Sequence, residues 1–261
     1  MSFERFHQDR FAQEFSQNGH VVFERCLPED FIERAREELS RAIALEAKYH
    51  GGTEYQDYGM VLLCALYGGV FWEMFELPQI VEPFNALLGE GCILYSQTST
   101  SMPPDSGNYA TRIHVDDARI IPGYCSKVAA LIALDDFSEE NGATWFLEGS
   151  HQMPSPPSEQ EFYAKAKRFT CPAGTIRFWN PRTWHAGGRN QTAFWRHALT
   201  AVMVRPYMKQ RIDVPRALSQ LDLSEVSPQV MQKLGFHAQV PASYDEYYAP
   251  PEKRKWRQKA E

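Results

Sequence analysis

The sequence has no long apolar run. Of its 261 residues 43% are hydrophobic, yet no segment approaches the roughly 18 consecutive apolar residues that cross a membrane. The amino-terminal stretch MSFERFHQDRFAQEF is polar and amphipathic, and lacks the apolar run of a secretory signal. We therefore expect no membrane partner and a cytoplasmic location.

An excess of basic residues is also missing. Lys and Arg total 27 against 33 Asp and Glu, which gives a formal net charge of -6. A protein whose main partner is nucleic acid usually presents a basic face. The charge balance therefore argues against a nucleic-acid partner.

Paired cysteines are absent as well. The 5 cysteines are odd in number, widely spaced and never in a C-x-x-C pair, so they indicate neither a disulfide framework nor a zinc knuckle. The length and apolar content suit one substantial core. We therefore predict a single domain over residues 1–261. Its expected partner is a small-molecule substrate, and it is expected to be a monomer or a homodimer.

Residues 1–90 alternate helical patterns with short strands. Pro28 stands where a first-turn proline is tolerated, and Glu29 and Asp30 suit a helix N-terminus. The apolar residues after them repeat at helical spacing. They are Phe31, Ile32, Ala35, Leu39, Ala42 and Ile43. We expect this zone to support a sheet.

From residue 92 to 206 the pattern changes to short β runs. These runs are CILYSQT, KVAALIAL, ATWFL, GTIRFW and RHALTAVMV, and turn-rich pieces such as PPDSGN and SEENG separate them. Many short strands with such turns are typical of a jelly roll or related barrel. Residues 151–170 interrupt the zone with a proline-rich loop. Ser158 and Glu161 there predict a capping box for a helix through Arg168, which we interpret as a lid-like insertion.

Residues 207–261 turn helical again. Ser227 and Pro228 predict the start of a short helix, and Gly235 predicts its end. The expected fold class is therefore mainly β with flanking helices (α+β), built around the jelly-roll core.

The segment R-I-H-V-D, residues 112–116, points to a metal. Side chains alternate along a strand, so His114 and Asp116 would lie on the same face, with about 6.6 Å of backbone between them. Both side chains could then bind one metal ion. His185 on another strand can supply a third ligand. Two histidines and one carboxylate on one side of a metal are typical of oxygen-activating Fe(II) sites. Arg196 would hold the far carboxylate of a keto-diacid co-substrate.

A lone H-x-D triplet is weak evidence for a metal site. In this chain, however, further motifs follow it in the sequence. RIHVDDARIIPGY is followed by ALDDFSEENGATWFLEGSHQ and TWHAGGRNQTAFWRHAL. Over roughly residues 92–206 this resembles the phytanoyl-CoA dioxygenase family of Fe(II)- and 2-oxoglutarate-dependent oxygenases. The resemblance implies a double-stranded β-helix (jelly-roll, cupin-like) with iron on His114, Asp116 and His185 and the co-substrate's distal carboxylate on Arg196. It also implies Fe(II), 2-oxoglutarate and O2 as cofactor and co-substrates.

Further contacts follow from position in the sequence. Gln97 and Thr144 are candidates for hydrogen bonds to 2-oxoglutarate, although each is also an ordinary polar strand residue. For the substrate, the candidates flank the metal ligands, and the alternative is that they are surface pairs or core aromatics. They are Arg112, Arg119, Tyr124 and Trp184. Asp117 and His197 directly follow Asp116 and Arg196, so we expect both to face away from the site.

The expected reaction is oxidation, most simply hydroxylation, of an unactivated carbon in a small metabolite, with release of succinate and CO2. Halogenating relatives have a small uncharged residue where this chain has Asp116. The carboxylate therefore argues for hydroxylation, desaturation, epoxidation or ring formation. Two alternatives remain: a non-redox cupin-like isomerase or hydrolase with the same ligands, which would not need Arg196 in its pocket, and an inactive binding relative.

Overall fold

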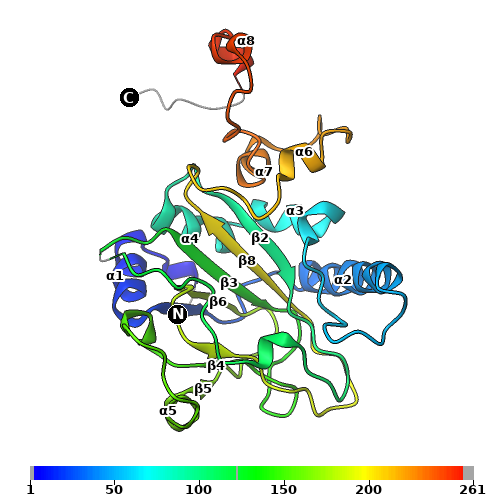
Figure 1. Ribbon diagram of the computed structural model, residues 1–261, viewed down its shortest axis with the longest axis vertical. Coiled ribbons are helices and arrows are strands. Elements are labelled where there is room, and N and C mark those ends of the chain that lie inside the picture. Colours follow the sequence, from blue (N-terminus) through cyan, green and yellow to red (C-terminus); the bar gives the residue numbers. More distant parts are fainter. Residues whose placement is uncertain (1–2, 122, 255–261) are drawn as a thin grey trace.

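The computed structural model describes residues 3–121 and 123–254, whose strands form two antiparallel sheets (Figure 1). The larger sheet has the order β1-β6-β3-β8-β2 and the smaller one β5-β4-β7. The strands are β1 (His20–Phe23), β2 (Ile93–Ser99), β3 (Lys127–Ala133), β4 (Trp145–Phe146), β5 (Lys167–Arg168), β6 (Ile176–Trp179), β7 (His185–Ala186) and β8 (Ala198–Val204). Each β run expected from the sequence overlaps one of these strands.

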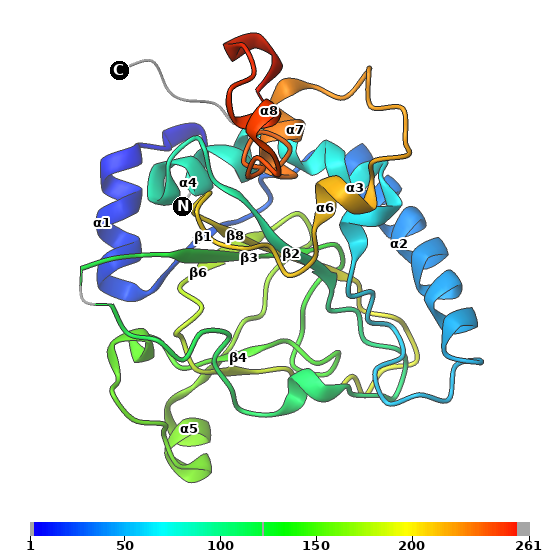
Figure 2. The ribbon, with the colours of Figure 1, turned by 45° about the horizontal axis from the view of Figure 1, so that its top comes forward.

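Helices flank the sheets (Figure 2). The α-helices are α1 (Gln8–Asn18), α2 (Glu29–Tyr49), α3 (Val70–Glu73), α4 (Pro78–Leu88), α5 (Glu159–Lys165), α6 (Val214–Ala217), α7 (Pro228–Lys233) and α8 (Tyr244–Tyr247). Short 3-10 helices are η1 (Phe3–Arg5), η2 (Cys64–Tyr67), η3 (Met74–Glu76), η4 (Tyr109–Thr111), η5 (Ser150–Gln152) and η6 (Pro251–Lys253).

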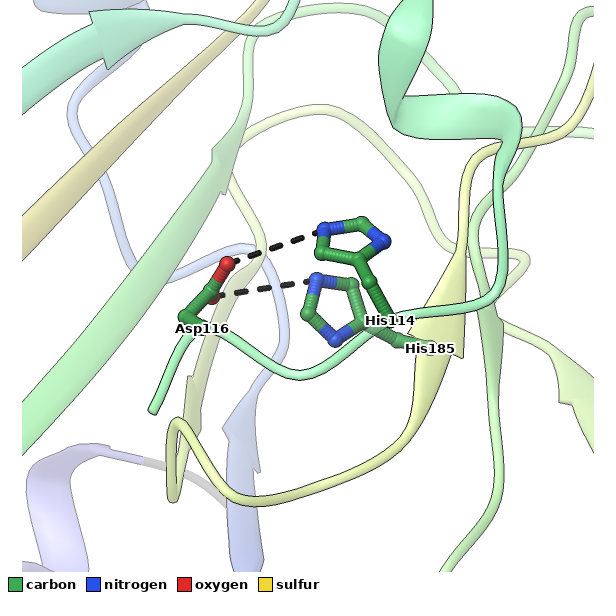
Figure 3. A group of neighbouring side chains, drawn as sticks. All are labelled: His114, Asp116 and His185. Carbon is green, nitrogen blue, oxygen red and sulfur yellow. Dashed lines mark ion pairs between the residues drawn. The ribbon is translucent and has the colours of Figure 1, made fainter. Parts of the chain in front are cut away.

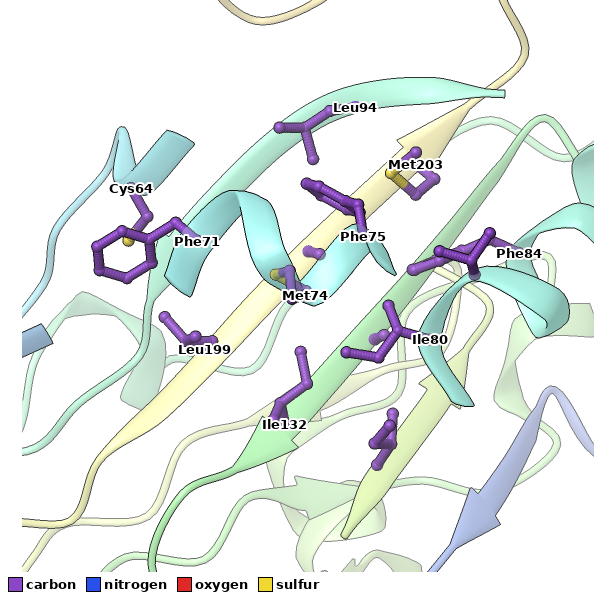
Figure 4. Close-up of a cluster of buried hydrophobic side chains, with 14 of the residues drawn as sticks. Cys64, Phe71, Met74, Phe75, Ile80, Phe84, Leu94, Ile132, Leu199 and Met203 are labelled. Carbon is purple, nitrogen blue, oxygen red and sulfur yellow. The ribbon is translucent and has the colours of Figure 1, made fainter. Parts of the chain in front are cut away.

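One face of the larger sheet packs against helices. Because side chains alternate along a strand, Ile132 of β3 and Leu199 of β8 share this face with neighbouring apolar residues, under α3, η3 and α4 (Figure 4). The α2 residues expected from helical spacing are all buried in the same cluster. Residues of α2 therefore belong to the apolar cluster that covers this face of the sheet.

The other face of the larger sheet points toward the smaller sheet. Leu131 of β3, Trp179 of β6 and Val202 of β8 are buried together with Phe146 of β4. The ring centroids of Phe146 and Trp179 lie 5.7 Å apart. This second cluster lies between the sheets, and the candidate site described below opens beside it.

Two local expectations need correction. The helix predicted to run through Arg168 starts as expected, with the Ser158–Glu161 capping box, but it ends at Lys165 because Arg168 pairs with Trp145 in β5 and β4. The H-x-D triplet lies in irregular backbone and not in a strand, apart from a single bridge between His114 and His185.

The carboxyl-terminal zone partly follows the prediction. Helix α7 begins at Pro228 with the Ser227 hydroxyl accepting a hydrogen bond from the Val230 amide. Gly235 follows the helix with a positive φ of 92°, which glycine adopts readily. Residues 255–261 of the predicted extension lie outside the described residues.

Within 3–121 and 123–254, no helix combines the length and the apolar character that a membrane span needs. All of the cysteines, which are Cys26, Cys64, Cys92, Cys125 and Cys171, are unpaired. The expectation of no disulfide framework is confirmed.

Phe178 provides a test of the packing between helices and sheet. Its side chain is fully buried, and its ring meets those of Phe11, Phe23 and Phe84 edge-on at centroid distances of 5.8, 6.0 and 5.2 Å. Phe178→Ala should lower the free energy of unfolding by about 3–5 kcal/mol, because it leaves a cavity. Phe194, which is 77% exposed, provides the matched control. Phe194→Ala should change the free energy of unfolding by about 0.5 kcal/mol or less. Equal effects in urea unfolding would contradict this core.

Candidate metal centre

His114, Asp116 and His185 converge on one point (Figure 3). Their ligand atoms all lie within 4.8 Å of one another. The Nε2 atoms of His114 and His185 are 3.6 and 3.8 Å from the two Asp116 carboxylate oxygens. Ligand–metal distances near 2 Å bring such atoms to about this separation. The structure therefore brings together the three predicted metal ligands.

Backbone hydrogen bonds fix the positions of these residues. The amide of His114 donates to the carbonyl of His185 at 2.9 Å, and the amide of His185 donates back at 3.0 Å. Asp116 is held by its own amide, which donates to the Pro181 carbonyl at 2.8 Å. The loop that carries the triplet is thus tied to β7 and to the turn before it, although it is not a strand.

Each histidine ring is oriented by a carbonyl. Nδ1 of His114 is 2.7 Å from the Arg112 carbonyl, and Nδ1 of His185 is 2.9 Å from the Thr183 carbonyl. A carbonyl only accepts, so each Nδ1 donates to its carbonyl, and each Nε2 is the ring nitrogen that faces Asp116 and is available to a metal. This arrangement is how proteins usually orient histidine ligands of a metal.

Packing supports the His185 ring further. The ring of Phe146 stacks on it at a centroid distance of 5.5 Å and an interplanar angle of 17°. Burial lowers the pKa of His185, while the negative charge of Asp116 opposes that shift. The ring is therefore neutral at physiological pH, as a metal ligand must be.

A cavity of about 240 Å³ reaches from this centre to Arg196. The Arg196 side chain is 1% exposed, and burial lowers its pKa to about 10, so it remains charged at neutral pH. One Nη donates to the Thr100 carbonyl at 2.8 Å. Its Nε and other Nη have no partner among the described residues. A buried cation with two free donors suits a carboxylate ligand.

Hydroxyl groups line the same cavity. Thr144, which the sequence suggested for the co-substrate, is buried in its wall. Thr98 and Thr200 are register partners in β2 and β8 and face it as well. A register shift between Leu94 and Ser96 lets Tyr95 and Ser96 both face the cavity, although they are adjacent in sequence. Ser96 and Thr98 were not predicted, although the alternation in YSQTST carried the signal for them.

Gln97 does not occupy the predicted position. Its amide nitrogen donates to the Phe71 carbonyl at 2.8 Å, on the helix-covered face of the larger sheet. Because Thr98 faces the cavity, strand alternation directs Gln97 away from it. The expected hydrogen bond from Gln97 to 2-oxoglutarate is therefore a wrong prediction.

The predicted substrate residues lie around the cavity and not in its wall. Arg112 is exposed, with its guanidinium over the Tyr109 ring at 5.8 Å. Arg119 and Tyr124 line a neighbouring cavity, and Tyr124 contacts Tyr207 through their hydroxyl groups. Trp184 packs against the apolar cluster of α5. Their positions do not support a direct contact with the substrate. These residues are close to the metal ligands in the sequence, but their side chains do not line the cavity that contains the ligands.

His197 and Asp117 face away from the site, as expected. His197 turns away from Arg196, with Nδ1 3.0 Å from an Asp135 carboxylate oxygen. Asp117 pairs with Lys127 at 3.2 Å and not with the metal ligands. Alternation along the chain explains the direction of His197, whereas Asp117 lies in irregular backbone and is turned away by its ion pair with Lys127.

The sequence reasoning missed three further residues of the cavity wall. Tyr109 precedes the triplet, Lys127 begins β3, and Arg211 follows β8. Burial and the charge of Asp116 raise the pKa of Tyr109, whereas the positive charge of Arg211 lowers it. Tyr109 therefore lies within electrostatic reach of both. Arg211 belongs to the carboxyl-terminal zone, where no motif marked it.

Solved structures with a similar fold include a non-heme monooxygenase and an epimerase. The chain is similar to the non-heme monooxygenase ThoJ, with a TM-score of 0.62, 22% identity and coverage of 77% of this chain and 80% of that one. It is also similar to the epimerase SnoN in complex with Fe3+, alpha ketoglutarate and nogalamycin RO, with a TM-score of 0.61, 20% identity and coverage of 85% and 92%. At these identities the similarity defines the fold.

The sequence places the chain more narrowly. Residues 15–198 match the family model for phytanoyl-CoA dioxygenase (PhyH). An uncharacterized protein of Mycobacterium tuberculosis (strain ATCC 25618 / H37Rv) is 31% identical over 251 residues, which cover 92% of this chain and 90% of that protein. The chain belongs to the phytanoyl-CoA dioxygenase family, as the resemblance of its motifs predicted.

Proposed function

We propose that the protein is an Fe(II)- and 2-oxoglutarate-dependent dioxygenase that hydroxylates an unactivated carbon of a small molecule. The observation that carries this proposal is one cavity that contains both the His114, Asp116 and His185 cluster and the buried Arg196. The first set has the ligand types of an oxygen-activating iron site, and the second suits a dicarboxylate. Family membership agrees with both.

The residues present fit this cofactor set. The two Nε2 lone pairs and the Asp116 carboxylate would hold iron from one side. Arg196 would bind the distal carboxylate of 2-oxoglutarate through its free Nε and Nη, and the hydroxyl of Thr144 lies in the wall of the same cavity. When bound, this set uses O2 to oxidise a C–H bond while 2-oxoglutarate becomes succinate and CO2. The apolar wall of Leu131, Phe146 and Trp179 would exclude water.

The fold itself supports the same proposal. The two antiparallel sheets face each other across a buried cluster, and the ligands come from loops and short strands at one opening. We infer a double-stranded β-helix within one domain over residues 1–261. A non-redox cupin-like enzyme would use the same three ligands, but it leaves the buried charge of Arg196 without a role.

Epimerisation is the second outcome, favoured by the similarity to the epimerase SnoN. Hydroxylation adds one oxygen atom to the product, whereas epimerisation leaves the mass unchanged and needs an added two-electron reductant, which supplies the hydrogen atom returned to carbon. Both outcomes share the predicted iron and 2-oxoglutarate sites.

Succinate release tests the proposal. The full chain incubated with Fe(II), 2-oxoglutarate and O2 should form succinate slowly, and faster when a library of metabolites includes its substrate. Mass spectrometry then separates a product heavier by one oxygen atom from one of unchanged mass. Zn(II) in place of Fe(II) should give no succinate, and metabolite conversion with Zn(II) alone would contradict the oxygenase assignment.

A further inference from the structure

Arg211 is a charged cavity residue that the proposed metal and co-substrate sites leave unused. It lines the same cavity as the metal ligands, although it comes from the segment after β8. Its amide donates to the Tyr95 carbonyl at 2.9 Å, which places it beside β2 at the edge of the cavity. Its side chain is exposed, and within the described part of the chain its guanidinium forms no ion pair.

The other charges of the cavity wall are balanced. Lys127 lies 3.2 Å from Asp117, so its charge already has a partner. In the proposed complex, iron and Arg196 would supply three positive charges. Asp116 and the two carboxylates of 2-oxoglutarate would supply three negative ones. Arg211 is then the cation that remains without a counter-charge in this wall.

Two tyrosine residues share the cavity wall with Arg211 and the metal ligands. Tyr109 is within electrostatic reach of both Asp116 and Arg211. Tyr95 lines the cavity too, with the Lys127 ammonium 4.8 Å from its ring centroid. The cavity wall thus combines two tyrosine side chains with the side chain of Arg211, whose amide is bonded to Tyr95. Apolar walls with one oriented charged group are typical of a small-molecule site.

We propose that Arg211 binds an anionic group of the substrate, so that the substrate is a small organic acid whose carbon skeleton lies along Tyr95 and Tyr109. The inference rests on the proposed function, because it assigns Arg196 to 2-oxoglutarate. The planar guanidinium forms paired hydrogen bonds with a carboxylate and binds a phosphate through the same donors. A neutral substrate would leave these donors to water.

Matched acid and amide probes test this proposal on the full chain. Mn(II) replaces iron to prevent turnover, and 2-oxoglutarate is present at saturation. Calorimetry then compares 3-phenylpropionate with 3-phenylpropanamide, and hexanoate with hexanamide. Hexyl phosphate is added as a second anion. The variants are Arg211→Gln and, as a matched control, Lys209→Gln, which removes an exposed cation two residues away.

The acids should bind the wild-type protein at least about tenfold more tightly than the amides, as expected for a charge-assisted hydrogen bond. Arg211→Gln should reduce this preference to about twofold or less, whereas Lys209→Gln should retain it. Tighter binding of hexyl phosphate than of hexanoate would identify a phosphate as the anionic group. Equal binding of acids and amides, no binding of any acid, or a preference that survives Arg211→Gln would overturn the proposal.

Binding of 2-oxoglutarate to the same Mn(II) protein shows whether a negative result concerns the role of Arg211 or the proposed function. Its affinity should be equal in the wild type, Arg211→Gln and Lys209→Gln. If 2-oxoglutarate binds while the acids show no preference, the assignment of Arg211 fails and the proposed function stands. If 2-oxoglutarate does not bind the wild-type protein, the proposed function itself fails.

Discussion

His185→Ala should abolish turnover and weaken Fe(II) binding by at least about a hundredfold. His185 supplies one of three ligands, and even loss of a residue that only orients a ligand typically costs about 10–100-fold in metal affinity. The fold should remain, because removal of the ring leaves the backbone bonds between His185 and His114 in place. Metal content after dialysis, together with urea unfolding, measures both effects.

His7→Ala is the control for His185→Ala, since His7 is exposed and its side chain does not cap α1. It should bind iron and turn over like the wild-type protein. Asp116→Ala should behave like His185→Ala, because it also removes one ligand. Iron binding retained in a folded His185→Ala protein would show that the metal centre lies elsewhere.

Arg196→Lys should raise the dissociation constant of 2-oxoglutarate by about one to two orders of magnitude. The substitution keeps a positive charge but loses the planar fork, and a hydrogen bond to a charged group contributes about 1.5–3 kcal/mol. The Nε and Nη of Arg196 that lack partners among the described residues are the groups expected to bind the carboxylate. Calorimetry with the Mn(II) protein measures the change without turnover.

Arg189→Lys is the matched control, because the Arg189 side chain is 61% exposed and lies 3.9 Å from Asp105. It should bind 2-oxoglutarate as the wild type does. Arg205 is also unsuited as an anchor, since its guanidinium donates to the carbonyls of Leu87, Leu88 and Cys125. An unchanged affinity in Arg196→Lys would mean that 2-oxoglutarate binds at another place.

Strand alternation explains why some site residues were predictable. Runs such as RHALTAVMV are long and apolar enough to predict a strand, and alternation then correctly separated Arg196 from His197. The same rule applied to YSQTST would have excluded Gln97, since Thr98 and Thr200 share the cavity face. The error came from choosing Gln97 by residue type and not by strand face.

Other features had no local signal. His114 and Asp116 were expected on one strand, but tertiary hydrogen bonds to His185 and Pro181 hold them in a loop. The shift in register at Tyr95 depends on pairing with β8, which the sequence of β2 alone does not encode. Arg211 reaches the cavity only because the segment after β8 returns past β2.

An anaerobic titration tests the central assignment most directly. Fe(II) is added to the full chain with 2-oxoglutarate under nitrogen, and the visible charge-transfer absorption of a chelated keto acid is recorded. One equivalent of Fe(II) should produce this band in the wild-type protein, Arg196→Lys should require much more 2-oxoglutarate, and His185→Ala should produce none. A wild-type protein that binds iron without the band, or a band that survives in His185→Ala, would contradict the assignment of this cavity to iron and 2-oxoglutarate.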